Sequence, residues 1–142
     1  MRLVLDTSVV VAGMRSPAGA SARLLDHAAQ GRLTIVFTTA LALEYEAVCL
    51  RSEHILAAGL DAAVAREFVD GLFTFAEPVE VWYALRPQSA DPDDDFLIEA
   101  AVNGGADAIV TFNTRDIDAP ARRFRVPVWA PAEALARVEN RP

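Results

Sequence analysis

The sequence predicts an α/β fold in which a mainly parallel sheet is covered on both faces by helices. Two observations predict it. The chain contains short apolar runs rich in β-branched or aromatic residues, which suit buried strands, and these runs alternate with longer segments of helical periodicity. The strand candidates are residues 3–5, 34–37, 79–82, 108–112 and 126–129. Because ligands of such sheets bind outside the carboxyl ends of the strands, polar residues that follow a strand are the first candidates for function.

The helical segments lie between these strands. A helix over residues 20–29 ends near Gly31, a suitable C-terminal cap. Asp61 is a suitable N-terminal cap for a helix that runs through residue 71. Further helical segments are residues 40–51, 96–103 and 131–138, the last with a proline in its first turn.

Length and composition restrict the class of protein. We expect 142 residues, of which 53% are hydrophobic, to form a single domain over residues 1–142. The formal net charge of -7 argues against a diffuse basic surface, so any nucleic acid must be held locally. All 13 cationic residues are arginines, and the missing lysine disfavours P-loop, Schiff-base and aspartyl-phosphate chemistry.

The sequence indicates a cytoplasmic protein without a membrane segment. Cys49 is the only cysteine, so no intrachain disulfide can form. No apolar stretch approaches the ~20 residues that span a bilayer. The N-terminus imitates a signal peptide, but Asp6 interrupts the apolar run where a signal peptide must be continuous.

Asp6 stands at the carboxyl end of the first predicted strand, where a buried charge is costly. The residues alone leave two interpretations open. Either Asp6 caps a helix over residues 7–14, or it belongs to a functional site. Thr7 and Ser8 place two hydroxyls directly beside it.

Two further acidic positions stand out. Glu44 lies in a helical segment with apolar residues at i-3, i+1 and i+4, so it faces or borders buried groups. The segment 91–95 holds four aspartates, which exceeds what helix capping requires. Closely spaced carboxylates raise one another's pKa unless a cation intervenes, so this segment is either a solvated loop or a metal site.

A last group of polar residues follows the strand predicted over residues 108–112. Asn113 by itself is typical of an Asx turn, and Asp116 lies three residues further on. Together the segments place oxygen ligands where parallel strands would gather them. Oxygen ligands without nearby His or Cys favour Mg²⁺ or Mn²⁺ over Zn²⁺, and we interpret His27 and His54 as surface or partly packed residues.

The chain resembles PIN-domain proteins, and among them VapC-like toxins, in four segments taken in order. These are Asp6 in Leu-Asp-Thr-Ser-Val, Glu44 in Leu-Glu-Tyr-Glu, Asp-Pro-Asp-Asp before Phe-Leu-Ile-Glu-Ala-Ala, and Gly-Ala-Asp-Ala-Ile-Val-Thr leading to Asn113 and Asp116. The resemblance implies a PIN-like three-layer α/β/α sandwich with a central, mainly parallel sheet of about five strands. It also implies a Mg²⁺- or Mn²⁺-dependent endoribonuclease that acts as the toxin of a toxin-antitoxin pair.

The same resemblance implies roles for individual residues. The implied catalytic acids are Asp6, Glu44, Asp94 and Asp116. The implied metal ligands are Asp6, Asp94, Asp116 and Asn113, the last at a place where the family carries Asp or Asn. The implied supporting residues are Thr7, Ser8, Asp91 and Asp95. Asp94 is preferred to Asp95 because the family's acid stands five residues before the glutamate found here at position 99.

The implied substrate is RNA, and the implied protein partners are a cognate antitoxin and a second copy in a homodimer. Arg15, Arg23 and Arg115 are the candidates to grip phosphate, with ordinary surface charge as the alternative for each. Leu56, Trp82 and Tyr83 belong to a group of apolar residues expected mostly in the core, with an exposed partner-binding patch as the alternative.

Two competing functions stay open. One is a catalytically weak or inert PIN-fold binding or regulatory protein, which Asn113 and the net negative charge motivate. The other is a phosphotransfer module with Asp6 as its nucleophile. The missing lysine disfavours the second, as does Ser8 at a position where aspartate-nucleophile phosphatases carry a second aspartate.

Overall fold

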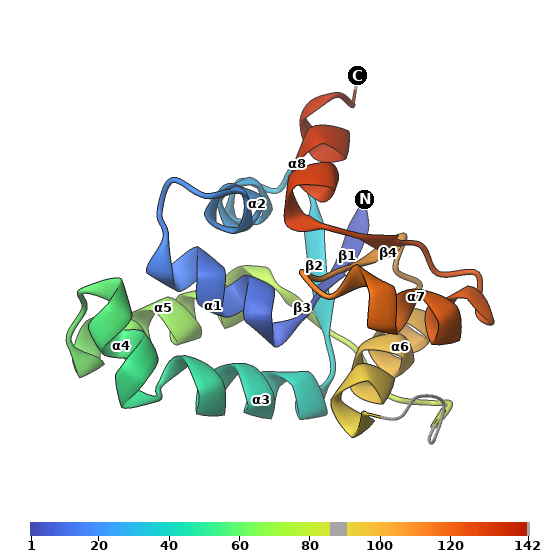
Figure 1. Cartoon of the computed structure of the whole chain (residues 1–142), viewed down its shortest axis with the longest axis horizontal. Coiled ribbons are helices and arrows are strands. Elements are labelled where there is room, and N and C mark those ends of the chain that lie inside the picture. Colours follow the sequence, from blue (N-terminus) through green and yellow to red (C-terminus); the bar gives the residue numbers. More distant parts are fainter. Residues whose placement is uncertain (86–90, 142) are drawn as a thin grey trace.

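The computed structural model describes residues 1–85 and 91–141, and in them it contains a five-stranded sheet in which every strand pair is parallel (Figure 1). The strands are β1 (Arg2–Leu5), β2 (Thr34–Phe37), β3 (Glu77–Pro78), β4 (Ala108–Val110) and β5 (Val128–Trp129). Their order across the sheet is β3-β2-β1-β4-β5. The predicted α/β/α architecture with a parallel sheet is confirmed.

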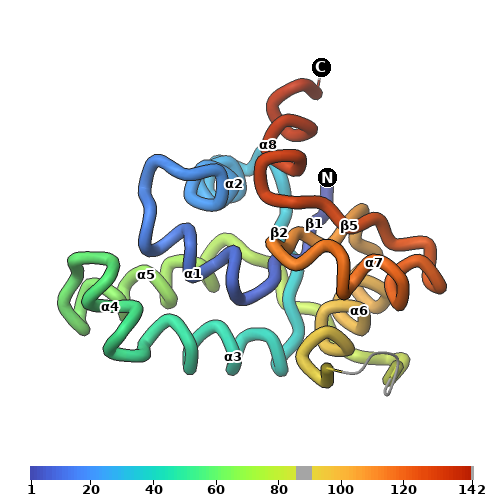
Figure 2. The backbone as a smooth tube through the Cα atoms, viewed as in Figure 1, coloured from blue at the N-terminus to red at the C-terminus, as the bar shows by residue number. Residues whose placement is uncertain are grey.

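Helices flank this sheet on both sides. Those in the described residues are α1 (Thr7–Arg15), α2 (Ala20–Ala29), α3 (Thr39–Cys49), α4 (Ser52–Ala58), α5 (Ala62–Phe75), α6 (Pro92–Gly104), α7 (Thr114–Arg122) and α8 (Pro131–Glu139). Figure 1 shows α1 to α5 to the left of the sheet and α6 and α7 to its right. The backbone trace in Figure 2 shows α8 beside α2, and these two helices pack together. No helix in the described part of the chain is long and apolar enough to cross a membrane.

The two central strands form the middle of the core. All side chains of Ala108–Val110 in β4 are buried, as are the last three of β1. Both strands are apolar without alternation because helices cover the sheet on both faces. Helix α6 packs against β1, β2 and β4, which fixes its position relative to the end of β1.

The strand order places the topological switch point of the sheet, the position at which open α/β folds form a crevice, between the carboxyl ends of β1 and β4. The chain leaves β1 toward β2 on one side of the sheet, and it leaves β4 toward β5 on the other side. Connections that diverge in this way open a space between the two strand ends, and ligands of open α/β sheets bind there. Asp6 follows β1 at this point, and its backbone N–H donates to the Val110 carbonyl at 2.8 Å.

Several local predictions are confirmed. Helix α2 has the predicted bounds, and Gly31 has the predicted role, with a left-handed φ of 76° that lets Arg32 N donate to the His27 carbonyl at 2.9 Å. Asp61 caps α5 by accepting a hydrogen bond from Val64 N at 2.9 Å. Helices α3 and α8 differ from their predicted bounds by one or two residues.

The prediction of a strand over residues 79–82 is wrong, because the strand of this region, β3, ends at Pro78, just before those residues. Glu77 and Pro78 pair with the end of β2, and Val79 N still donates to the Phe37 carbonyl at 2.8 Å. The chain then leaves the sheet: the backbone N–H groups of Trp82 and Tyr83 both donate to Asn103 Oδ1. A side-chain amide therefore replaces the sheet as their partner.

Helix predictions were wrong in two places. Helix α6 begins at Pro92 and not at residue 96, so the acidic segment is its first turn instead of a loop. Helices α4 and α7 were not predicted. Helix α4 has seven residues, too few to show a repeated apolar stripe, and α7 contains Pro120.

Three large apolar residues expected in the core lie on the surface. Leu56 and Trp82 are each 77% exposed, and Tyr83 is 68% exposed. Strand β4 also ends at Val110, earlier than predicted, which leaves Phe112 outside the sheet and 59% exposed. Apolar character alone does not separate core from surface, since much of any protein surface is apolar.

Candidate active site

Asp6 is held by a hydrogen bond from the neighbouring strand end. It precedes α1, but its carboxylate makes no capping hydrogen bond to that helix. Thr111, directly after β4, donates from Oγ1 to Asp6 Oδ2 at 2.7 Å instead. Thr111 is fully buried and its Oγ1 also accepts a hydrogen bond from Asn113 N at 3.0 Å. Asp6 occupies the N-cap position of α1, but its side chain does not cap the helix, so the capping interpretation of its carboxylate is wrong.

Helix α3 brings Glu44 to the same place. Its neighbour Tyr45 is fully buried and donates from its hydroxyl to the Leu5 carbonyl, which ties α3 to the end of β1. Glu44 is half-buried, and burial raises its pKa, with further increases from Asp93, Asp6 and Asp91.

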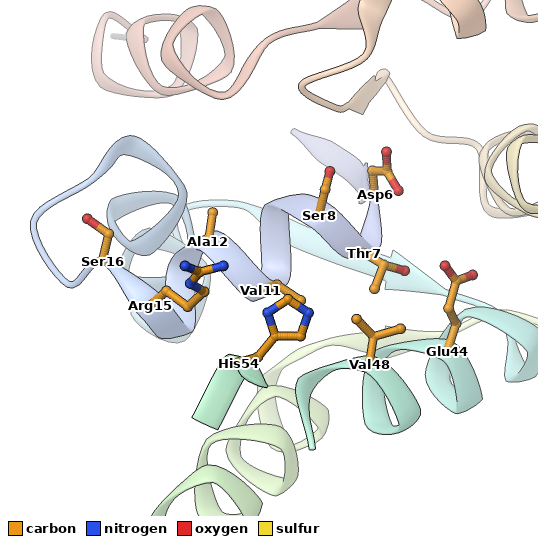
Figure 3. Close-up of a pocket in the computed structure, with 10 residues that line it drawn as sticks. All are labelled: Asp6, Thr7, Ser8, Val11, Ala12, Arg15, Ser16, Glu44, Val48 and His54. Carbon is orange, nitrogen blue, oxygen red and sulfur yellow. The ribbon is translucent and has the colours of Figure 1, made fainter. Parts of the chain in front are cut away.

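Thr7 and Ser8 differ in their surroundings. The hydroxyl of Thr7 faces Glu44 (Figure 3) and partly lowers the pKa of that carboxyl, although Thr7 Oγ1 is buried and makes no hydrogen bond of ordinary geometry. A buried hydroxyl without a partner is costly unless another group binds it. Ser8 is exposed and lies on the same turn of α1 as Thr7.

The first turn of α6 supplies the third group of acids. Asp91 caps the helix by accepting a hydrogen bond from Asp93 N at 2.9 Å. Burial raises the pKa of Asp94 to about 6, with increases also from Asp91, Asp6, Asp116 and Asp93. Asp95 differs from Asp94 in being almost completely buried, at 2% exposure.

The segment after β4 contributes a coupled pair. Asn113 begins α7 and uses its Nδ2 to donate to Asp116 Oδ2 at 2.8 Å. Its side chain makes no capping hydrogen bond to the helix, so the Asx-turn interpretation is wrong. Both residues are exposed, and the amide fixes the orientation of the Asp116 carboxylate.

The pKa shifts indicate which acids lie close together. Asp6 raises the pKa of Glu44, Asp94 and Tyr45, while Asp116 raises that of Asp94. The structure thus gathers four separate segments of the chain around the crevice between β1 and β4, each with a carboxylate. Such repulsion is relieved by protonation or by a cation.

The donor set of this site is suited to a hard divalent cation. Every candidate ligand atom is an oxygen. The amide nitrogen of Asn113 is not a candidate, because it donates a hydrogen bond to Asp116. As the side chains lie, no three Asp, Glu, His or Cys residues within 1–85 and 91–141 converge closely enough to hold a metal ion. Binding a cation therefore requires the carboxylates to turn toward one another.

A groove of about 640 Å³ begins at the acids and runs along α1 (Figure 3). Asp6, Thr7 and Glu44 line one end, and Arg15 and Ser16 line the other. The remaining lining residues are Ser8, Val11, Ala12, Val48 and His54. Helices α1, α3 and α4 supply the walls of this groove.

The three candidate arginines have different surroundings. Arg15 lines the groove. Arg23 is bound by both carboxylate oxygens of Glu139 at 2.6 Å, between α2 and α8, so the structure does not place it with the acids. Arg115 is exposed in the first turn of α7, next to Asp116 in sequence.

Sequence reasoning missed two parts of the site. Thr111 stands directly after β4, just as Asp6 stands directly after β1, but the strand was predicted over residues 108–112, which placed Thr111 inside it. His54 and Val48 carried no comparable signal, because the packing of α3 and α4 against α1 is a tertiary contact.

Comparison with models of known protein families identifies the family of this chain. A family model described as a PIN domain matches residues 2–115 of the chain, which include every candidate acid of the site except Asp116. A search of proteins with curated functions finds no match.

Proposed function

Because the chain belongs to the PIN-domain family, we propose that it is a Mg²⁺- or Mn²⁺-dependent endoribonuclease and the toxin of a toxin-antitoxin pair. PIN domains are generally nucleases, and proteins with this domain generally bind RNA. The observation that carries the proposal is that Asp6, Glu44, Asp94 and Asp116 come from four segments that meet around the β1–β4 crevice, where burial and then neighbouring carboxylates raise the pKa of Glu44 and of Asp94.

Within this proposal each acid has a part that its surroundings support. Asp6 and Asp94 are the principal metal ligands, with Asp116 and the Asn113 side-chain oxygen completing the set. Thr111 holds the Asp6 carboxylate in one orientation through its 2.7 Å hydrogen bond. The partial burial of Asp94 contrasts with the nearly complete burial of Asp95, which supports Asp94 as the third acid.

The reaction is hydrolysis of an RNA phosphodiester. A bound Mg²⁺ or Mn²⁺ supplies stabilisation of phosphoryl charge and a lowered pKa for a water molecule. Glu44 orients the attacking water from the half-buried face of α3. The water loses a proton and its oxygen bonds to phosphorus, while the bond from phosphorus to the 3′ oxygen breaks and that oxygen takes up a proton, which leaves a 5′-phosphate and a 3′-hydroxyl.

The test compares cleavage of RNA by the wild type with Mg²⁺ or Mn²⁺, with a chelator, and by Asp6→Asn with metal. We expect cleavage only in the first case. Asp26→Asn is a matched control, because Asp26 is an exposed aspartate of α2 outside the site. Equal cleavage in all conditions would mean that a contaminating nuclease or another site is responsible.

The toxin role has its own test. We expect expression of the wild type to arrest growth of its host, and Asp6→Asn to leave growth unaffected. A small neighbouring gene that encodes a protein with a DNA-binding N-terminus should restore growth when it is expressed together with the wild type. Cleavage of RNA in vitro without growth arrest would favour a role in RNA processing.

A second candidate is a PIN-fold binding protein that does not cleave. It is favoured by the spacing of the acids, since no three in the described residues converge enough to hold a metal ion as they lie. Metal titration distinguishes the two functions. A nuclease gains thermal stability from millimolar Mg²⁺ or Mn²⁺ through its acids, whereas an inert binding protein gains none.

A further inference from the structure

The groove along α1 has opposite charge at its two ends. Its acidic end is formed by Asp6 and Glu44, and its other end contains the Arg15 guanidinium and, nearer the middle, the His54 ring (Figure 3). From Thr7 to Arg15 the helix advances by about 12 Å, at about 1.5 Å per residue. The groove therefore extends beyond the position of a single phosphodiester at the acids, since stacked nucleotides in one strand are about 3.4 Å apart.

Arg15 has no carboxylate partner within the described residues. It makes no salt bridge there, whereas Arg23, Arg66, Arg122 and Arg137 each bind a glutamate or an aspartate. Its place in the last turn of α1 is favourable for a cation. A guanidinium that lines a groove and is not already neutralised by a carboxylate is available to bind phosphate.

His54 lines the same groove as Arg15 and comes from α4. Its side chain is 19% exposed, and its Nδ1 is buried without a hydrogen-bond partner among the described residues. Its Nε2 is 4.0 Å from the exposed Glu53 carboxylate, too far for a hydrogen bond. No hydrogen bond among the described residues therefore fixes the ring, and the partly exposed side chain lines the groove.

The walls between the two charged ends are apolar or carry small hydroxyls. Val11 and Ala12 come from α1, and Val48 comes from α3. Such a surface suits the face of a nucleobase or a sugar, and the charged ends suit the phosphates on either side of it.

We propose that this groove binds the RNA strand next to the cleaved bond, with Arg15 and His54 receiving a phosphate that is not itself attacked. The proposal rests on the proposed function, and it assigns a role to His54 that the sequence did not indicate. Arg15 and His54 are positioning residues, because both lie away from the acids along the groove. The apolar walls give the groove affinity for single-stranded RNA without a requirement for particular bases.

The first experiment measures binding without cleavage. A fluorescent, single-stranded RNA of twenty nucleotides is titrated with Asp6→Asn protein at several salt concentrations, alone and with Arg15→Gln or His54→Ala added. We expect Arg15→Gln to weaken binding about tenfold and to reduce the slope of log affinity against log salt by about 0.7, the value for one phosphate contact on a single strand. We expect His54→Ala to weaken binding about threefold.

The matched control is Arg32→Gln. Arg32 is exposed and lies at the turn before β2, at the amino ends of the parallel strands, whereas the acids follow the carboxyl ends. Its replacement should change neither affinity nor salt slope. A loss of affinity in Arg15→Gln with an unchanged slope would reflect an altered fold and would overturn the proposal.

A second experiment separates this proposal from the proposed function. With metal present, Arg15→Gln in an otherwise wild-type chain should raise KM for the long RNA about tenfold, leave kcat within about twofold, and leave cleavage of a dinucleotide unchanged. If the wild type binds RNA with the expected slope but never cleaves it, the nuclease function fails and the groove assignment stands. If Arg15→Gln and His54→Ala weaken only the binding of an antitoxin, the groove is a protein-binding surface and the proposal is wrong.

Discussion

Thr111 Oγ1 donates a hydrogen bond to Asp6 Oδ2 at 2.7 Å and thereby joins the ends of the adjacent strands β4 and β1. The two residues are 105 positions apart in the sequence. Because Thr111 is fully buried, packing restricts its rotamer. Its hydrogen bond therefore restricts the orientation of the Asp6 carboxylate as well.

Replacing Thr111 by Val should weaken metal binding. The valine keeps the shape of the side chain but removes the donor to Asp6, and loss of such an orienting partner typically costs 10- to 100-fold in metal affinity. It also leaves Asn113 N without its acceptor, so we expect the free energy of unfolding to fall by about 1 kcal/mol. Calorimetric titration with Mn²⁺ measures the first effect and urea unfolding the second. Thr111→Ser should retain wild-type affinity, and an equal loss in both variants would contradict the assignment.

Replacing Glu44 by Gln should reduce the rate of RNA cleavage without abolishing binding. The amide retains the size of the side chain but does not attract a proton from the attacking water, so we expect kcat to fall by about 10²-fold or more at unchanged KM. Glu46→Gln is the control on the same helix, because the Glu46 carboxylate pairs with Arg66 at 3.3 Å and not with the site. A similar fall in kcat for both variants would point to a disturbed α3 instead of a catalytic Glu44.

Replacing Asp94 by Asn should stabilise the metal-free protein above about pH 6. The pKa of Asp94 is raised from 3.8 to about 6, so between these values the folded state binds more protons than the unfolded state. The free energy of unfolding contributed by this group therefore falls as pH rises through that range, and the loss is complete above it. Because Asp94 is partly exposed, we expect a gain of only about 1 kcal/mol for Asp94→Asn at pH 7.5.

Urea unfolding of Asp94→Asn in a chelator at pH 4 and pH 7.5 measures this gain. The two proteins should have equal stability at pH 4, where Asp94 is protonated in the folded state. Mg²⁺ at pH 7.5 should raise the stability of the wild type and leave that of the variant unchanged. A variant that is less stable than the wild type at pH 7.5 would contradict the repulsion inferred among the acids.

Replacing Asn113 by Asp should strengthen the dependence on metal. The new carboxylate faces Asp116, where the amide now donates at 2.8 Å, so an attraction becomes a repulsion. We expect the metal-free melting temperature to fall and the increase produced by Mn²⁺ to be larger than in the wild type. Thermal unfolding with and without Mn²⁺ checks this, and Asn113→Ala separates loss of the hydrogen bond from gain of charge. An unchanged response to Mn²⁺ would place residue 113 outside the metal's coordination.

Much of the fold was predictable because its signals are local. Buried strands need short apolar runs, and helices need apolar residues at a spacing of three or four, and both patterns are visible in segments such as 34–37 and 20–29. The residues Gly31 and Asp61 were predicted as caps for the same reason, since capping depends on backbone conformation and on neighbours within a few positions.

The acids were also predictable, but their individual surroundings were not. Asp6 at a strand end and four aspartates in the segment 91–95 are features of the sequence, and the order of the motifs indicated the family. Whether Asp6 caps a helix or turns toward Thr111 depends on which strand lies beside β1. Exposure separates Asp94 from Asp95, and only the packing of α6 against the sheet determines it.

The sequence by itself therefore determined the architecture, the family and the set of candidate acids. The tertiary structure alone decided that Thr111 orients Asp6, that Glu139 neutralises Arg23, and that Arg15 shares a groove with His54. The physical reason is the range of the interactions involved. Periodicity and capping act over a few residues, whereas hydrogen bonds, ion pairs and grooves join side chains that only the folded sheet and its helices bring together.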